Sequence, residues 1–224
     1  MSKPELGSRL HFGSGKLSTE PNLSVFINCP FDNEFLPLFD AIVFATVCCG
    51  FLPRSALESG NVAESRIDRI IRTMFSSKYS IHDLTRCTGA GDENLARFNM
   101  PLELGIAMAR RFVSDRVGED HDWLVLVPEG HQYLRFISDL AAYDPKQHDG
   151  TVASVVPKVM SWLATRLDAV RTPTPKQVLE ALPAFIDRKR QLADDWSGDV
   201  PWADLVAGAV DVAREQWHEW SPGA

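Results

Sequence analysis

The sequence predicts an α/β protein built on a parallel sheet. Apolar, β-rich runs stand at residues 23–28, 78–84 and 122–127, and segments with helical periodicity separate them. The third run, DWLVLV, is almost continuously apolar, which is typical of a strand buried on both faces. Strands that alternate with helices indicate βαβ units, and right-handed crossovers then give a flavodoxin-like three-layer sandwich with a C-terminal helical extension.

The first βα unit is the clearest in the sequence. The run at 23–28 ends in a turn, and Asp32 or Asn33 is expected to cap a helix that Gly50 ends. Residues 51–60 predict a weak strand or extended segment, because Pro53 cannot donate a ladder hydrogen bond.

Two further helices are predicted from amphipathic spacing. Residues 61–77 place Arg66, Arg69 and Arg72 outward, which we interpret as a solvated face. Residues 101–112 form the second helix, with Asn99 as its cap and Glu103 in its first turn. The helix macrodipole favours an acidic residue there, so a purely structural role is one interpretation of this glutamate.

The last part of the chain is predicted to be helical. No strand is predicted between residues 128 and 150, and the helix that follows is expected to kink or begin late at Pro157. Residues 171–175 predict a linker, and helical pieces follow near 176–193 and 202–220. We therefore divide the chain into a leader (1–22), a flavodoxin-like domain (23–170) and a C-terminal helical extension (171–224).

Composition restricts the partners and the compartment. The chain has 224 residues, a net charge of -7 and a pI near 5.4, which does not favour a nucleic-acid partner. No apolar run is long enough for a signal peptide or a membrane span, so we expect a cytoplasmic protein with no membrane partner. The four cysteines lack disulfide or metal-ligand spacing and are interpreted as reduced, mostly buried thiols.

Candidate site residues lie where the predicted strands end. In parallel α/β sheets, ligands bind outside the carboxyl ends of the strands, at the switch point of the strand order. The side chains expected at this edge are Asn28, Pro30, Phe31, Asp32, Arg54, Glu58, His82, Asp83, Arg86, Asn99 and Glu103. Phosphate-binding loops and a serine nucleophile elbow are absent, and His82 has no further metal ligands at useful spacing. We expect neither a metal nor a cofactor.

The acidic pair Asp83 and Glu103 suits chemistry at a sugar carbon. Cleavage of an N-glycosidic bond develops positive charge on the ribose ring, which a carboxylate stabilises or attacks covalently. Phe31 is placed to stack on a base, and Arg54 to meet a phosphate. Each residue also has a structural interpretation: Asp83 as a loop cap, Arg54 as a surface salt bridge and Phe31 as part of the core.

Three short motifs resemble the nucleoside 2-deoxyribosyltransferase superfamily. They are FINCPF on the first strand, IHDL on the third and ELGIA at the start of a helix, within residues 23–130. That superfamily shares a flavodoxin-like fold with Toll/interleukin-1 receptor (TIR) domains, many of which cleave NAD, and the chain also looks similar to bacterial TIR-like proteins of antiphage defence. The sequence RFNMP before the glutamate departs from the Asp-Gly-Thr-like approach of the transferases.

The resemblance implies roles for individual residues. Glu103 would be the nucleophile or the cation-stabilising acid, and Asp83 would be the acid at the end of strand three. Pro30 and Phe31 match the first loop of the transferases. Gly105, together with Ala107, would let the sugar pocket and the sheet approach the helix.

Two functions of different classes follow. The first is an enzyme that cleaves the N-glycosidic bond of a nucleotide or nucleoside, with NAD preferred. The second is a non-catalytic module that senses nucleotides or assembles. Trp196, Trp202, Trp217 and Trp220 are either a self-association surface, in line with the homo-oligomer that we expect, or packing of the extension onto the domain.

Overall fold

The sheet is parallel throughout, as the sequence predicts. The computed structural model describes residues 23–58, 63–87, 98–113, 121–130, 132–166 and 172–217. Its strands, in the order β2-β1-β3-β4-β5, are β1 (Ser24–Asn28), β2 (Leu52–Arg54), β3 (Tyr79–Asp83), β4 (Asp122–Pro128) and β5 (Lys146–His148). This order confirms the flavodoxin-like arrangement, and it places the switch point between β1 and β3.

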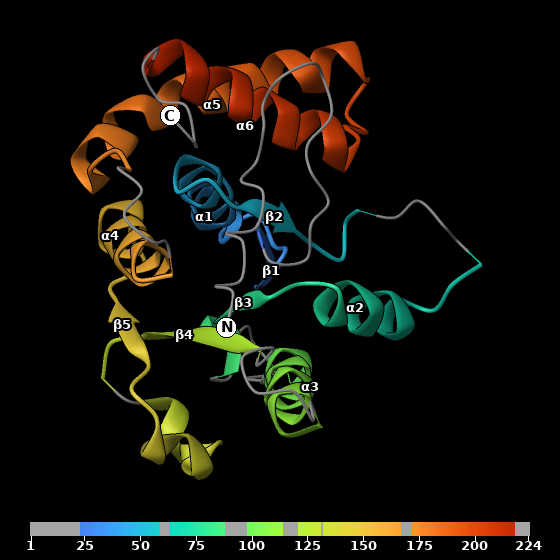
Figure 1. Ribbon diagram of the computed structural model, residues 1–224, viewed down its shortest axis with the longest axis vertical. Helices are drawn as coiled ribbons and strands as arrows, with labels where there is room; N and C mark the ends of the chain where they lie inside the picture. Colours follow the sequence, from blue (N-terminus) through green and yellow to red (C-terminus); the bar gives the residue numbers. More distant parts are fainter. Residues whose placement is uncertain are drawn as a thin grey trace, which may run out of the picture.

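Helices cover both faces of the sheet (Figure 1). α1 (Leu36–Cys48) and α4 (Val152–Ala164) pack on one face, and α2 (Arg66–Phe75) and α3 (Asn99–Val113) pack on the other. Short 3₁₀ segments complete the fold: η2 (Thr85–Cys87), η3 (Gln132–Arg135) and η4 (Ser138–Ala142). The last two lie between β4 and β5, where a crossover helix would otherwise stand.

Strand alternation decides which site residues share a face. Val25 and Ile27 point into the core under α1, whereas Phe26 points into the cluster under α2 and α3. Since side chains alternate along a strand, Asn28 lies on the face of Phe26, and His82 lies on the face opposite Ile81. Asn28 and His82 therefore meet beneath α3.

Several predicted boundaries are wrong for local reasons. β5 was not predicted, because its three residues are polar and, among the described strands, it pairs with β4 alone. α4 begins at Val152 and continues through Pro157, with the side chain of Thr151 as its cap. α1 begins at Leu36, while Asp32 instead accepts a hydrogen bond from the backbone N–H of Phe35 in the preceding turn.

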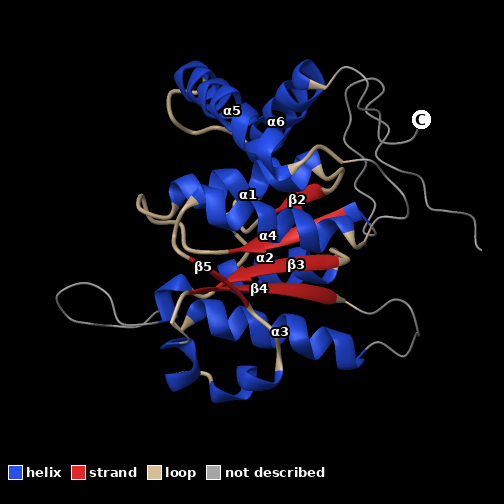
Figure 2. Ribbon diagram, turned by 90° about the vertical axis from the view of Figure 1, so that its left-hand side faces the viewer, coloured by secondary structure: helices blue, strands red, loops and turns tan. Residues whose placement is uncertain are grey.

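The C-terminal helices extend the core beyond α1. α5 (Pro175–Asp195) and α6 (Trp202–Gln216) stack on the side of α1 that faces away from the sheet (Figure 2). Phe44 of α1 stacks on Phe185 with ring centroids 5.1 Å apart, and Lys189 Nζ lies 2.7 and 2.8 Å from the carboxylate oxygens of Asp40. The helices that we assigned to an extension thus share one hydrophobic cluster with α1 and α4.

The tryptophans mainly serve this packing. Trp202 is buried, Trp217 packs against the core cluster, and Trp196 is 48% exposed. Trp220 and the predicted leader, residues 1–22, lie outside the described residues. None of the described helices is long and apolar enough to cross a membrane.

Candidate functional site

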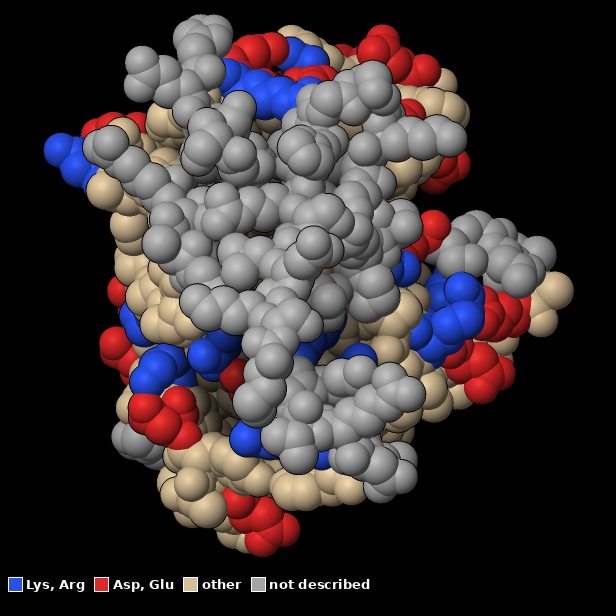
Figure 3. All heavy atoms as spheres, viewed as in Figure 1, with Lys and Arg blue, Asp and Glu red and all other residues tan. Residues whose placement is uncertain are grey.

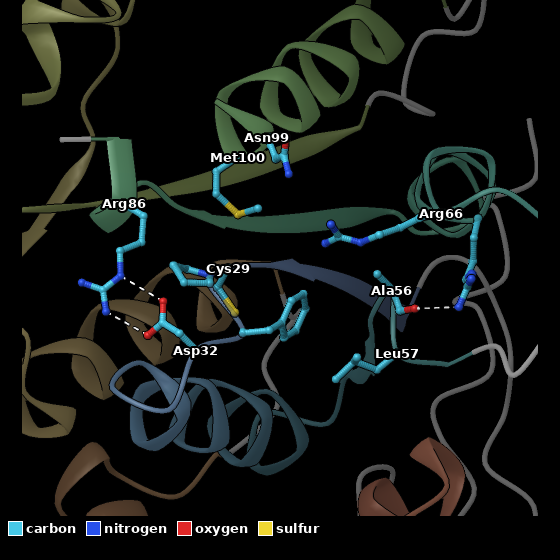
Figure 4. Close-up of a pocket in the computed structure, with 11 residues that line it drawn as sticks. Cys29, Asp32, Ala56, Leu57, Arg66, Arg86, Asn99 and Met100 are labelled. Atoms are coloured by element: carbon cyan, nitrogen blue, oxygen red, sulfur yellow. Dashed lines mark hydrogen bonds and ion pairs between the residues drawn. The ribbon is translucent and has the colours of Figure 1, made fainter. Parts of the chain in front are cut away.

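A cavity opens at the carboxyl edge of the sheet, beside the switch point. It has a volume of about 470 Å³. The first loop, the segment after β2, α2, η2 and the start of α3 all contribute to its wall (Figure 4). The lining residues are Cys29, Pro30, Phe31, Asp32, Ala56, Leu57, Arg66, Arg69, Arg86, Asn99 and Met100. Five residues expected at this edge, Pro30, Phe31, Asp32, Arg86 and Asn99, are thus brought together.

Three arginines give this cavity a cationic wall. Arg86 donates to both carboxylate oxygens of Asp32, at 3.0 and 2.8 Å, and to Glu34 at 2.7 Å, and these hydrogen bonds raise its pKa further. Arg69 donates to the carbonyl oxygen of Ala56 at 3.5 Å. Arg66 points from α2 toward the middle of the cavity in Figure 4. No described residue forms a hydrogen bond or ion pair with its guanidinium.

Glu103 is buried on the inner face of α3. Its exposed fraction is 4%, and its helical neighbours on that face are Met100, Leu104 and Ala107. The predicted position in the first turn is wrong: α3 begins at Asn99, so Asn99 is not a cap and Glu103 is the fifth helical residue. A helix can begin before Pro101 because its first four N–H groups lack intrahelical partners. The macrodipole falls off within the first turn, so it does not explain this glutamate.

The environment of Glu103 disfavours its charge. Burial raises its pKa from 4.5 to about 7, and the positive charge of Arg66 opposes part of that rise. Among the described residues, none donates a hydrogen bond to the carboxylate. A buried carboxyl with no hydrogen-bond donor among the described residues, with a pKa near neutrality and beside a cavity, has the properties of a functional acid. Glu103 itself is not part of the cavity wall, which Asn99 and Met100 form one turn earlier.

Asp83 lies at the end of β3 but in a different environment. One carboxylate oxygen accepts a hydrogen bond of 2.8 Å from the backbone N–H of Thr85, as in a loop cap. The other oxygen lies 3.1 Å from Nε2 of His148 on β5, without hydrogen-bond geometry. Asp83 follows Ile81 on the face of α1 and α4, whereas Glu103 covers the opposite face. The two carboxylates are therefore not assembled as a pair.

Other predicted site residues are placed apart from the cavity. Arg54 ion-pairs with Glu58 four residues later, in line with the salt-bridge interpretation. His82 is fully buried and hydrogen-bonds to Asn28 and Ser80. Gly105 is on the exposed face of α3, where an added Cβ would meet nothing within 4 Å, so a close approach does not require glycine there.

The sequence interpretation missed the arginines of α2. They were assigned to a solvated face, yet Arg66 and Arg69 both line the cavity, and only Arg72 turns to Glu64 outside it. The spacing of three residues between Arg66 and Arg69 was the available signal, because it places both on one helix face. Within the described residues there is no group of three or more potential metal ligands, and all four cysteines are buried and free.

Charge of both signs is visible on one face of the molecule. On the face shown in Figure 3, acidic side chains lie beside most of the visible Lys and Arg groups. The whole chain has a net charge of -7, so arginines gathered in a cavity suit a small anionic ligand better than a polyanion.

Comparisons with known proteins do not assign this site. No protein-family model, curated protein or solved structure matches the chain.

Proposed function

We propose that this protein cleaves the N-glycosidic bond of a nucleotide or nucleoside. NAD⁺ hydrolysis, in a TIR-like defence role, is preferred to nucleoside deoxyribosyl transfer. The observation that carries the proposal is Glu103, a buried carboxyl with a pKa of about 7 on the helix whose first turn lines the cavity.

The chemistry requires a carboxylate at the anomeric carbon. As the C1′–N bond breaks, its electron pair leaves with the base, and positive charge develops on the ribose. The proposal requires the ribose to reach Glu103 behind the wall residues Asn99 and Met100, where the carboxylate stabilises this charge or forms a glycosyl ester that water then opens. For NAD⁺ and water, the products are ADP-ribose, nicotinamide and a proton.

The cavity favours a phosphorylated substrate over a free nucleoside. Arg66 carries a guanidinium that no described side chain pairs, and it points into the cavity (Figure 4). Arginine binds phosphate oxygens with two parallel N–H groups, whereas a nucleoside offers no anion for it. This preference places NAD⁺ ahead of deoxynucleosides.

Product analysis by chromatography tests the proposal. The protein is incubated with NAD⁺, and separately with deoxynucleosides and a free acceptor base. We expect nicotinamide release that Glu103→Gln abolishes and Glu180→Gln, an exposed carboxylate on α5, leaves intact. Base exchange would instead identify a transferase. Turnover that persists in Glu103→Gln would overturn the role of this residue.

A second candidate function is non-catalytic nucleotide sensing or assembly. The observation that favours it is the separation of Asp83 from Glu103, because Asp83 is engaged by Thr85 and His148. In that case NAD⁺ binds, as measured by calorimetry, and no product forms. Sedimentation of the protein with and without NAD⁺ then measures whether the nucleotide controls the proposed homo-oligomer.

A further inference from the structure

A continuous chain of hydrogen bonds runs through the buried layer beneath α3. Asn28 Nδ2 lies 2.9 Å from His82 Nδ1, and His82 Nε2 lies 2.8 Å from Ser80 Oγ. Ser80 Oγ in turn lies 2.8 Å from Nε2 of His121, whose Nδ1 is 3.1 Å from the carbonyl oxygen of Ser77. Every side chain in this chain is buried, with an exposed fraction of 1% or less.

Two groups compete for Nδ1 of His121 at the far end of the chain of hydrogen bonds. Arg110 Nη1 lies 2.9 Å from it and also donates to the carbonyl oxygens of Met74, at 2.7 Å, and of Ser77. The carbonyl oxygen of Ser77 lies 3.1 Å from the same nitrogen. A guanidinium only donates and a carbonyl oxygen only accepts, so the far end is compatible with either tautomer of His121. The near end fixes the direction instead, because the carbonyl oxygen of Met100, 3.4 Å from Asn28 Nδ2, accepts from an NH₂ group.

The roles of the other groups follow from the NH₂ group of Asn28. It donates to His82 Nδ1, so in a neutral ring Nε2–H of His82 donates to Ser80 Oγ. Ser80 Oγ meets Nε2 of His121 as a donor or as an acceptor, according to the tautomer of that ring. Burial supports neutral rings, because it lowers the pKa of His82 to about 3 and of His121 to about 4.

The near end of the chain leaves one polar atom without a partner. Asn28 also directs its NH₂ group toward the carbonyl oxygen of Met100 at 3.4 Å, so both contacts of that group are with acceptors. Its Oδ1 is buried, and no described residue donates to it. Asn28 stands directly behind the cavity wall, since the next residue, Cys29, and its contact, Met100, both line the cavity.

We propose that Ser80, His82 and His121 are positioning residues that hold the Asn28 amide with its oxygen free, as an acceptor for a hydrogen-bond donor of the bound molecule. A ribose hydroxyl or a carboxamide N–H supplies such a donor. The identity of the ligand rests on the proposed function, whereas the direction of the chain does not.

Nuclear magnetic resonance of the imidazole nitrogens tests the direction of the hydrogen bonds independently of any enzymatic activity. Long-range ¹H–¹⁵N spectra identify which nitrogen of each histidine carries the proton. We expect His82 protonated on Nε2. Ser80→Ala removes the acceptor of His82, so both tautomers of His82 should then be present. His82 protonated on Nδ1 in the wild-type protein would overturn the proposal.

Kinetics with NAD⁺ tests whether the fixed Asn28 amide contributes to binding and turnover of the ligand. Loss of the fixed amide should lower kcat/KM about tenfold in Ser80→Ala, the effect of one lost hydrogen bond. Ser80→Thr keeps the hydroxyl and should recover most of the activity, and Thr46→Val removes a fully buried hydroxyl that bonds the carbonyl oxygen of Ile42 within α1, as a control. A Ser80→Ala variant with altered tautomers and unchanged kcat/KM would overturn the positioning role. If no substrate is turned over, the proposed function fails, while the tautomer of His82 still decides the direction of the chain.

Discussion

The burial of the single residue Glu103 makes the free energy of unfolding depend on pH. In the unfolded chain this carboxyl has its ordinary pKa of 4.5, and in the folded protein it is about 7. Between these values the folded protein holds a proton that the unfolded chain has released. The free energy of unfolding therefore falls as pH rises through this window, by up to about 3 kcal/mol.

Glu103→Gln should remove this dependence. The amide carries no charge to desolvate, so the variant should be more stable than the wild type at pH 8 by about 1–3 kcal/mol and similar to it at pH 4. Urea unfolding at the two pH values measures the difference. Equal stabilities at pH 8 would show that the folded protein does not raise the pKa of this group.

The effect of Arg66 on the pKa of Glu103 can also be tested. The guanidinium lowers the pKa of the carboxyl, so Arg66→Met should move the rise of kcat/KM with pH to a higher pH. The same variant should weaken NAD⁺ binding, since it removes from the cavity wall a guanidinium that no described residue pairs. Arg72→Met is the control, because Arg72 pairs with Glu64 outside the cavity. An unchanged pH profile for Arg66→Met would contradict the coupling.

At the scale of elements, a buried ion pair attaches α5 to α1. Asp40 is 5% exposed and depends on Lys189, whose Nζ lies 2.7 Å from it. Lys189→Met should lower the free energy of unfolding by about 3 kcal/mol, because it leaves a buried acid without its partner. Asp40→Leu combined with Lys189→Met should recover most of this loss, as measured by urea unfolding. A double variant no more stable than Lys189→Met would mean that packing, not charge, dominates here.

The elements also show what the sequence was able to predict. Strands β1, β3 and β4 and most helices follow from hydrophobic periodicity, because these segments are long and bury a continuous face. The three polar residues of β5 carry no such signal, since their conformation depends on pairing with β4. In α3, the apolar side chain of Leu102 is 59% exposed, whereas the buried row contains Glu103. Hydrophobicity alone cannot identify a buried row that includes a carboxylate.

The candidate site was partly predictable for the same reason. Strand-end residues such as Pro30, Phe31 and Asp32 were placed correctly, because the parallel topology fixes where strands end. Arg66 and Arg69 were missed because they lie on α2, the helix that follows β2, whereas Pro30, Phe31 and Asp32 directly follow β1. Asp83 and Glu103 were paired from their strand order, whereas the alternation of β3 turns Asp83 to the opposite face.

At the scale of the whole molecule, α5 and α6 are part of the folding unit. They cover side chains of α1 that are fully buried, among them Phe44. A chain ending at residue 171 should therefore expose this face, bind hydrophobic dyes and lose cooperative unfolding, in contrast to the full chain. Circular dichroism during urea unfolding measures the cooperativity. A sharp transition in the shortened chain would instead show that residues 23–171 fold on their own.

The contact between Trp202 and β2 also limits how this protein can aggregate. β2 is an outer strand, and outer strands elsewhere recruit further strands through unpaired backbone groups. At Pro53 the backbone has no N–H to offer, and the indole Nε1–H of Trp202 already occupies its carbonyl at 3.2 Å. Fibril-like growth is therefore blocked at this margin of the sheet, and copies of the chain that associate on this side must do so through helices.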